Sequence, residues 1–229
     1  MNRTRGSRIL RRLDDARLLA TGRTIARKYA HFTMIAPGAF VGNLLLVSRA
    51  RDLPGCVVEC GVWRGGMSAG MAEVLGPDRD YYLFDSFEGL PPAGELDGAG
   101  AVQWQRENTA PEYHDNCSAE MSFAQQAMAL SPARRVTLKK GWFADTLPGF
   151  EPAQGIAVLR LDGDWYDSTR QCLDALYRQV VPGGVVIIDD YYRWEGCTKA
   201  VHDFLSQEKT PDRIRQSKVG GIAYIVRGA

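Results

Sequence analysis

The sequence predicts an α/β fold in which helices flank a mostly parallel central sheet. Short apolar segments alternate with helical segments along most of the chain, which is typical of right-handed βαβ units. Several apolar segments, such as 156–159 and 185–188, contain no alternating polar residues, which indicates strands buried on both faces. The 229 residues are enough for one globular domain with a short additional segment.

The first half of the chain begins this alternation. We expect an amphipathic helix around residues 9–19, with Leu10, Leu13 and Leu18 on or near one face, and a second helix over 40–51. A strand over 55–60, a helix of small and apolar residues over 66–75 and a strand over 81–85 follow. The stretch 88–116 is rich in Gly, Pro, Ala and acids, and it predicts a long irregular loop of the kind that is usually functional or disordered.

The second half continues in the same way. We expect a helix over 118–130 with Ser118 as a possible N-cap, and then strands over 136–139 and 156–161. A helix over 168–179, a strand over 185–190, a helix over 197–205 and a last strand over 221–226 complete the pattern.

Acidic residues fall where the predicted strands end. In parallel α/β sheets, ligands bind beyond the carboxyl ends of the strands, near the point where the strand order reverses. The fold therefore predicts that one rim of the sheet gathers five acids, namely Glu59, Asp85, Asp162, Asp189 and Asp190.

Composition narrows the class of protein. The formal net charge of +1 gives no general argument for nucleic acid or an anionic membrane as partner, and the longest apolar runs are too short to span a bilayer. The five cysteines show no zinc spacing, and their odd number argues against a closed disulfide framework, so we expect reduced thiols in the cytoplasm. The same near-zero net charge disfavours nucleic acid as a substrate.

The N-terminal region is basic, with nine Lys or Arg among the first thirty residues. No apolar core segment or cleavage site of a secretory signal follows them. We therefore expect residues 1–50 to form a helical arm, and both a lid over the site and a dimer contact remain open as its role.

Two motifs suggest a nucleoside ligand. The first strand runs into a glycine-rich turn with Gly61 and Gly65, whose following helix N-terminus can hold a carboxylate. The spacing is not that of a dinucleotide site, and a purely structural tight turn is the alternative. Asp85, at the end of the second strand, is placed to accept hydrogen bonds from ribose hydroxyls, although it could also cap a loop.

The acids of the later strands suggest a metal and a base. Asp162, Asp189 and Asp190 would repel one another unless something neutralises them, and three carboxylates with substrate oxygens and water suit Mg²⁺. Loop acids and caps are the alternative interpretation. Asp164 could act as a general base towards a hydroxyl, or could be a turn residue.

Five ordered motifs resemble the macrocin O-methyltransferase family, and the resemblance extends over roughly residues 30–205, which is most of the chain. They are ECGVWRGG at 59–66, FDSFEGLP at 84–91, KGWFADTLP at 140–148, LDGDWYDST at 161–169 and PGGVVIIDDY at 182–191. The resemblance implies a Rossmann-like class I methyltransferase domain over 51–229, which uses S-adenosylmethionine and Mg²⁺. Members methylate sugar hydroxyls during antibiotic and other natural-product biosynthesis.

The resemblance also implies roles for individual residues. Four residues would surround the methionine part of the cofactor: Glu59, Gly61, Arg64 and Gly65. Asp85 and Ser86 would lie at the ribose. Ser118, Gly141, Trp142 and Phe143 would line the adenine pocket, and Thr33 and Met34 would fold over the cofactor. Asp162, Asp189 and Asp190 would bind Mg²⁺, and the base would be Asp164, with Asp162 also considered.

Several regions depart from the family pattern. The chain is short near its N-terminus, the helix after Ser118 carries fewer charges, and the loop 91–116 has its own sequence. These regions shape the acceptor pocket, so the resemblance does not identify the acceptor. It implies a small hydroxyl-bearing molecule, and we expect a glycosylated natural product. It also suggests a homo-oligomer. A catechol-type O-methyltransferase and a non-catalytic protein that binds S-adenosylmethionine are the alternatives.

Overall fold

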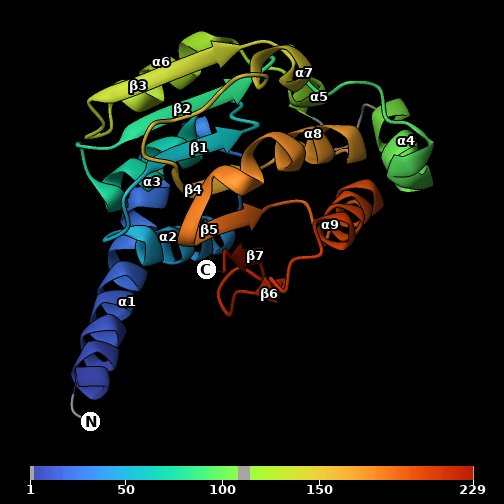
Figure 1. The fold of residues 1–229 in the computed structure, drawn as a ribbon. Helices are drawn as coiled ribbons and strands as arrows, with labels where there is room; N and C mark the ends of the chain where they lie inside the picture. Colours follow the sequence, from blue (N-terminus) through green and yellow to red (C-terminus); the bar gives the residue numbers. More distant parts are fainter. Residues whose placement is uncertain (1–2, 108–113, 229) are drawn as a thin grey trace.

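The strands of the described chain form a single seven-stranded sheet (Figure 1). The computed structural model describes residues 3–107 and 114–228, without the side chains of residues 3–14 and 114. The strand order is β3-β2-β1-β4-β5-β7-β6. The strands are β1 (Cys56–Cys60), β2 (Asp80–Asp85), β3 (Arg135–Lys140), β4 (Ile156–Leu161), β5 (Val180–Ile188), β6 (Arg215–Gln216) and β7 (Ala223–Val226).

The sheet is mostly parallel, as predicted. Strands β1 to β5 pair in parallel, whereas β7 runs antiparallel to β5, and β6 runs antiparallel to β7. The chain moves outward from β1 to β3, returns to β4 beside β1, and then continues to β5. The order therefore reverses between β1 and β4, and their C-terminal ends flank the crevice where such sheets bind ligands.

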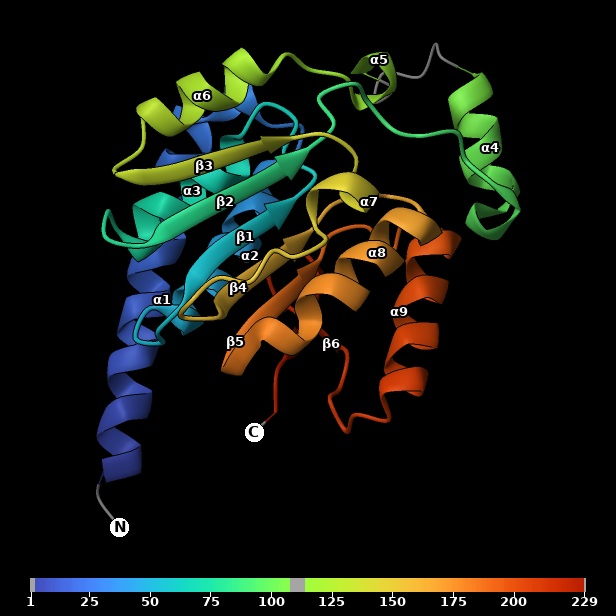
Figure 2. The ribbon, with the colours of Figure 1, turned by 45° about the horizontal axis from the view of Figure 1, so that its top comes forward.

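Helices cover both faces of this sheet (Figure 2). One face is covered by α1 (Arg3–Lys28), α2 (Pro37–Val47), α3 (Gly66–Leu75) and α6 (Met121–Ala129), and the other by α7 (Phe143–Thr146), α8 (Tyr166–Leu176) and α9 (Glu195–Glu208). Short 3-10 turns follow α1, α2 and α8, at Ala30–Phe32, Ser48–Ala50 and Tyr177–Gln179. This arrangement confirms the α/β prediction.

The sheet separates two apolar cores. Every residue of β1 and β4 is buried, and neighbouring residues of a strand point to opposite faces. Val57 packs with the core beneath α2 and α3, whereas Val58 packs with the core beneath α8 and α9. Burial on both faces explains why these strands read as continuous apolar runs.

The region 88–116 differs from the predicted irregular loop. It contains a 3-10 turn at Glu95–Asp97 and the helix α4 (Gly98–Arg106), and α4 lies beyond the C-terminal ends of the strands, beside α9 (Figure 1). Ala101 of α4 is buried in the core of α8 and α9. Packing against other elements therefore stabilises a helix that its glycine-rich sequence does not predict.

The chain before α6 also departs from prediction. The short element α5 (His114–Cys117) has left-handed backbone conformations at Asp115, Asn116 and Cys117. The backbone N–H of Ser118 closes this turn by donating to the carbonyl of Asp115, and α6 begins only at Met121. The N-cap of α6 is Glu120, so the prediction of Ser118 as the N-cap is wrong.

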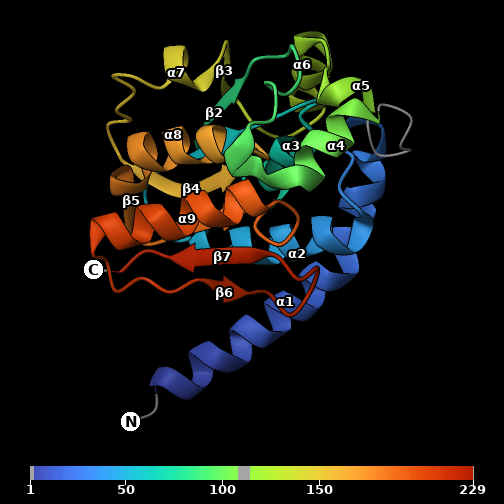
Figure 3. The same ribbon diagram turned by 90° about the vertical axis from the view of Figure 1, so that its right-hand side faces the viewer.

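The remaining differences concern the lengths of elements. Helix α1 extends well beyond the predicted 9–19, and its first turns project away from the body (Figure 3). Leu18 is buried as predicted, whereas the side chains of Leu10 and Leu13 lie outside the described residues. Strand β5 begins at Val180 rather than 185, and α7 and β6 were not predicted. Among the described residues, no helix has the length and apolar character needed to cross a bilayer.

Candidate active site

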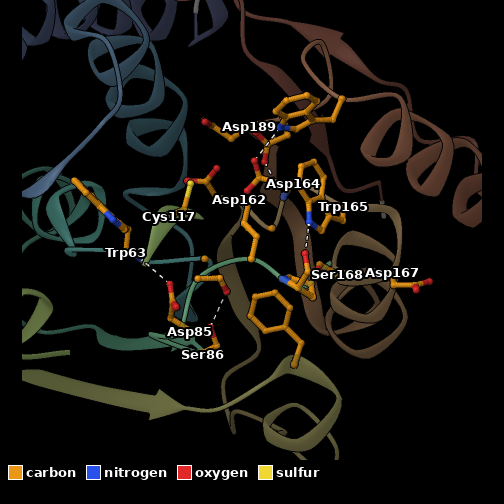
Figure 4. A pocket seen from close by; sticks show the side chains of 18 of the residues that line it. Trp63, Asp85, Ser86, Cys117, Asp162, Asp164, Trp165, Asp167, Ser168 and Asp189 are labelled. Atoms are coloured by element: carbon orange, nitrogen blue, oxygen red, sulfur yellow. Dashed lines mark hydrogen bonds between the residues drawn. The ribbon is translucent and has the colours of Figure 1, made fainter. Parts of the chain in front are cut away.

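A cavity of about 660 Å³ opens at the C-terminal ends of the parallel strands (Figure 4). Its walls come from the turns that follow β1 to β5, from residues 32–35 between α1 and α2, and from the α4 region. Asp162, Asp164 and Asp189 group on one side of the cavity, with Asp85 and Ser86 across from them (Figure 4). The five acids expected at one rim of the sheet therefore line a single cavity.

Asp85 organises the turn between β1 and α3. Its Oδ2 accepts hydrogen bonds from the backbone N–H groups of Val62 at 2.6 Å and Trp63 at 2.8 Å, and its Oδ1 accepts one from Phe87 at 2.6 Å. Burial raises the pKa of Asp85, and the three backbone donors oppose this shift. Trp63 and Phe87 both have positive φ, so the carboxylate stabilises two strained residues at the cavity wall.

Glycine is required where the first and fourth strands end. Gly61 has a φ of 86°, and a Cβ at this position would lie 1.8 Å from the carbonyl oxygen of Asp162. The backbone N–H of Asp162 in turn donates to the carbonyl of Cys60 at 2.8 Å. The glycine turn and the acidic turn are therefore in direct main-chain contact.

Three carboxylates converge after β4 and β5. One oxygen from each of Asp162, Asp189 and Asp190 lies within 4.8 Å of the other two. Burial raises the pKa of Asp162 to about 6, against the opposing charge of Arg160. Burial and the neighbouring acids raise the pKa of Asp190 well above its usual value. Crowded carboxylates of this kind favour a proton or a cation between them.

Arg160 stands beneath this cluster, and sequence reasoning missed it. Its side chain is 1% exposed, and its Nη1 lies 2.7 Å from both Glu59 Oε1 and Asp162 Oδ2, while its Nη2 lies 2.7 Å from Asp189 Oδ1. Although burial alone would lower the pKa of Arg160, the three acids raise it well above its usual value. The available signal was a charged residue within the apolar run of β4.

Glu59 shares this buried network. The residue is 1% exposed, and its carboxylate accepts hydrogen bonds from Ser68 and Arg160. Burial raises the pKa of Glu59 to about 7, while the charge of Arg160 opposes the shift. The carboxylate lies at the wall of the cavity, at the end where the glycine turn begins.

Asp164 faces the cavity from a strained backbone position with a φ of 58°. Its Oδ1 accepts a hydrogen bond of 2.9 Å from the indole Nε1–H of Trp194. Burial raises the pKa of Asp164 to about 8, and the charge of Asp162 adds to the shift. Strain of this kind persists where surrounding contacts hold it, and it is common at functional sites.

Three tryptophans, which sequence reasoning did not single out, form an aromatic wall beside Asp164. The rings of Trp104, Trp165 and Trp194 meet edge to face, with centroids 5.2–6.2 Å apart. Trp104 belongs to α4, Trp165 precedes α8 and Trp194 precedes α9. Helix α4 thus completes a wall whose other two members lie just before α8 and α9.

The structure brings together most of the residues expected to bind the cofactor. Those that line the cavity are Thr33, Met34, Glu59, Gly61, Asp85, Ser86, Gly141, Trp142 and Phe143. Three do not line it. The guanidinium of Arg64 lies over the rings of Trp63 and Phe123, at 4.4 and 4.6 Å from the ring centroids. Gly65 precedes α3 with a φ of 81°, and the carbonyl of Ser118 accepts the Nε1–H of Trp63.

The strand order and the position of the cavity define a class I methyltransferase. Solved structures support this class. The O-methyltransferase NovP superposes with a TM-score of 0.71 at 31% identity, over 86% of this chain and 83% of NovP. The calicheamicin methyltransferase CalS11 superposes with a TM-score of 0.65, over 83% of this chain and 79% of CalS11; at 21% identity it supports the fold alone.

The chain belongs to the macrocin O-methyltransferase family, a family of S-adenosylmethionine-dependent O-methyltransferases. The family profile, described as Macrocin-O-methyltransferase (TylF), matches residues 40–225. This match confirms the family expected from the five motifs.

Three curated relatives are named as O-methyltransferases from Streptomyces and Micromonospora species. A Streptomyces olivaceus protein named 8-demethyl-8-(2,3-dimethoxy-alpha-L-rhamnosyl)-tetracenomycin-C 4'-O-methyltransferase is 37% identical over 76% of this chain and 66% of its own length. Demethyldecarbamoylnovobiocin O-methyltransferase of Streptomyces niveus is 36% identical over 71% and 63%. Mycinamicin III 3''-O-methyltransferase of Micromonospora griseorubida is 34% identical over 73% and 67%. The chain thus spans about two thirds of the length of these relatives.

Proposed function

We propose that this protein is a Mg²⁺-dependent O-methyltransferase that transfers the methyl group of S-adenosylmethionine to a hydroxyl group on a glycosylated natural product. One observation carries the proposal. A cavity of about 660 Å³ places the acid cluster of Asp162, Asp189 and Asp190 opposite Asp85 and the glycine turn, as a reaction between a bound nucleoside and an acceptor hydroxyl requires. The names of the relatives support the acceptor class.

The proposed cofactor position follows the cavity wall. Glu59 and Gly61 would contact the methionine part, Asp85 and Ser86 the ribose, and residues 141–143 the adenine, with Thr33 and Met34 as a cover. All of these residues line the cavity. Arg64, Gly65 and Ser118 do not line it, so their assignment rests on the family resemblance alone.

The acid cluster fits a hard divalent cation. Its donors are carboxylate oxygens, which Mg²⁺ prefers, and Arg160 occupies only one oxygen of Asp162 and one of Asp189. Asp190 is buried, and its Oδ2 accepts the backbone N–H of Asp164 at 3.1 Å. When bound, Mg²⁺ would supply Lewis-acid chemistry by lowering the pKa of the acceptor hydroxyl.

Asp164 is the proposed general base, because it faces the cavity and makes no ion pair with Arg160. The acceptor hydroxyl gives its proton to the Asp164 carboxylate, and its oxygen forms a bond to the methyl carbon as the carbon–sulfur bond breaks. The products are a methyl ether and S-adenosylhomocysteine. Asp162, the alternative base, has one oxygen bound to Arg160 and is better suited as a ligand. Alignment of oxygen, methyl and sulfur would provide much of the rate.

The acceptor would lie against the aromatic wall of Trp104, Trp165 and Trp194. Binding sites of this kind combine apolar and aromatic walls with a few polar groups that fix orientation. Flat aromatic faces suit the apolar faces of sugar rings, and Asp164 stands beside the wall to receive the hydroxyl proton.

Two further features belong to the proposal. Residues 1–50 would act as an N-terminal arm that covers the cofactor and contributes to a homo-oligomer. Residues 32–35 line the cavity, and the first turns of α1 extend away from the body, which supports this role (Figure 1). The five cysteines are free thiols, which is consistent with action in the cytoplasm.

Calorimetric titration tests the proposal. Chelator-treated protein is titrated with S-adenosylhomocysteine and then with Mg²⁺, and Asp189→Ala is compared with Asp174→Ala, an exposed acid on α8. We expect nucleoside binding in all three proteins and loss of the Mg²⁺ response in Asp189→Ala alone. Absence of nucleoside binding would contradict the cofactor, and an intact Mg²⁺ response in Asp189→Ala would contradict the metal site. Mass spectrometry after incubation with glycosides and with catechols then separates sugar from phenolic acceptors.

A further inference from the structure

We propose that Arg160 is a positioning residue that couples the cofactor end of the cavity to the acid cluster. Its guanidinium contacts Glu59 of β1, Asp162 after β4 and Asp189 after β5, each at 2.7 Å. Glu59 lies at the end assigned to the methionine part of the cofactor, while Asp162 and Asp189 are the assigned metal ligands. One side chain therefore joins both halves of the site, and the inference rests on the proposed function.

Burial makes these contacts obligatory. A fully buried guanidinium is tolerated only when carboxylates and hydrogen-bond acceptors surround it, and removal of one partner leaves an uncompensated charge. Arg160 is 1% exposed, and its Nε lies 3.4 Å from the side-chain Oδ1 of Asn43, so an oxygen atom lies within 3.4 Å of each guanidinium nitrogen. The charged guanidinium of Arg160 therefore cannot move from this position into water.

The planar shape of the guanidinium gives the coupling its geometry. Nη1 and Nη2 are fixed relative to each other, so a shift of Glu59 changes the position available to Asp162 and Asp189. Each acid has one oxygen held by Arg160 and a second oxygen that the guanidinium does not contact. Outer residues that orient metal ligands in this way commonly change metal affinity 10–100-fold when they are replaced.

The substitution Arg160→Lys separates charge from geometry. Lysine keeps the positive charge but offers a single nitrogen, which cannot reproduce the planar fork. Arg79→Lys is the matched control, because Arg79 donates hydrogen bonds to four backbone carbonyls, including those of Gly55 and Ala50, at the opposite ends of the strands. Both variants are expected to lower the melting temperature.

Binding constants distinguish coupling from a purely structural role. The dissociation constant of S-adenosylhomocysteine is measured by calorimetry with chelator and with Mg²⁺. In the native protein, Mg²⁺ should change this constant about fivefold or more, a typical coupling between sites. In Arg160→Lys the change should vanish and Mg²⁺ should bind about tenfold more weakly, whereas Arg79→Lys should behave as the native protein does.

Unchanged nucleoside affinity and unchanged coupling in Arg160→Lys would overturn the inference. If this variant does not fold, Glu59→Gln replaces it. Glu59 is not a proposed metal ligand, so weaker Mg²⁺ binding in this variant is expected only if Arg160 transmits the change. Native Mg²⁺ binding in Glu59→Gln would refute the coupling. If the native protein binds no Mg²⁺, the metal part of the proposed function fails. The chelator measurement still decides whether Arg160 holds Glu59 for the nucleoside.

Discussion

The carboxylate of Asp97 accepts a hydrogen bond of 2.6 Å from the backbone N–H of Tyr166, the first residue of α8. Its second oxygen accepts the N–H of Gly94 at 2.7 Å, and the side chain is buried. This carboxylate therefore ties the segment that leads into α4 to the start of α8. The position of Trp104, and with it the aromatic wall, depends on this attachment.

We predict that Asp97→Ala weakens acceptor binding while leaving cofactor binding intact. Two N–H groups lose their partner, which costs about 1–3 kcal/mol of stability for each one left buried. KM for the acceptor should rise, and the dissociation constant of S-adenosylhomocysteine should stay native. Steady-state kinetics and calorimetry measure both, with Asp78→Ala, an exposed acid, as control. A matching loss of cofactor affinity would show that the α4 region supports the whole cavity.

The indole of Trp194 offers a test of the proposed base. Trp194→Phe removes the donor to Asp164, and hydrogen bonds to charged groups contribute about 1.5–3 kcal/mol. If that energy holds the base in position, kcat should fall about tenfold or more with little change in KM. Trp165→Phe removes a donor to the carbonyl of Pro91 and should raise KM instead. Equal effects of both substitutions on kcat would argue against Asp164 as the base.

Asp85 should control cofactor affinity through the loop that it organises. Asp85→Asn places an amide group where a carboxylate oxygen accepts backbone N–H groups, and an unsatisfied donor costs about 1–3 kcal/mol. The dissociation constant of S-adenosylhomocysteine should rise about tenfold, which corresponds to about 1.4 kcal/mol. Asp80→Asn, at the exposed start of β2, is the control. Native affinity in Asp85→Asn would show that cofactor binding does not depend on the loop that Asp85 organises.

The hydrogen bonds of Asp212 predict a pH-dependent stability. Burial alone would raise the pKa of Asp212, but hydrogen bonds from Tyr177 Oη at 2.6 Å and from the N–H of Gly228 at 2.7 Å lower it. A lowered folded pKa stabilises the protein above the unfolded value of about 3.9, and the contribution is lost as pH falls through the folded pKa.

Tyr177→Phe measures this contribution. The variant should lose about 1.5–3 kcal/mol of unfolding free energy at pH 7, because it removes a hydrogen bond to a carboxylate. The difference from native protein should shrink below about pH 4 in urea denaturation, once Asp212 is protonated. Tyr192→Phe, an exposed tyrosine, should change stability little at either pH. A difference that stays constant with pH would assign the effect to packing.

The acid cluster could be predicted because local sequence and topology act together. Asp162, Asp189 and Asp190 directly follow apolar runs, and the carboxyl ends of adjacent parallel strands meet at one edge. Arg160 could not be predicted in the same way, since an arginine in an apolar run does not reveal which acids it will meet. Its partner Glu59 lies 101 positions away in the sequence.

In the α4 region, the local sequence alone predicted the wrong structure. Its sequence, GAGAVQWQR, has weak helical propensity, so local pattern favoured a loop. The helix forms because Ala101 and Trp104 pack against the core of α8 and α9, and because Asp97 fastens its start. Ser118 was misplaced for a related reason, since the left-handed conformations at 115–117 depend on Asn116 bonding both backbone groups of Leu90.

The contact between Gly61 and the carbonyl of Asp162 has a consequence for how this enzyme family can diversify. The loops after β1 and β4 contact each other through main-chain atoms, whereas the α4 region is attached to the start of α8 through the side chain of Asp97. Mutation can therefore change the α4 region without displacing the residues assigned to the cofactor and the metal. We therefore expect acceptor range to change through residues 91–117 while the geometry of methyl transfer is inherited unaltered.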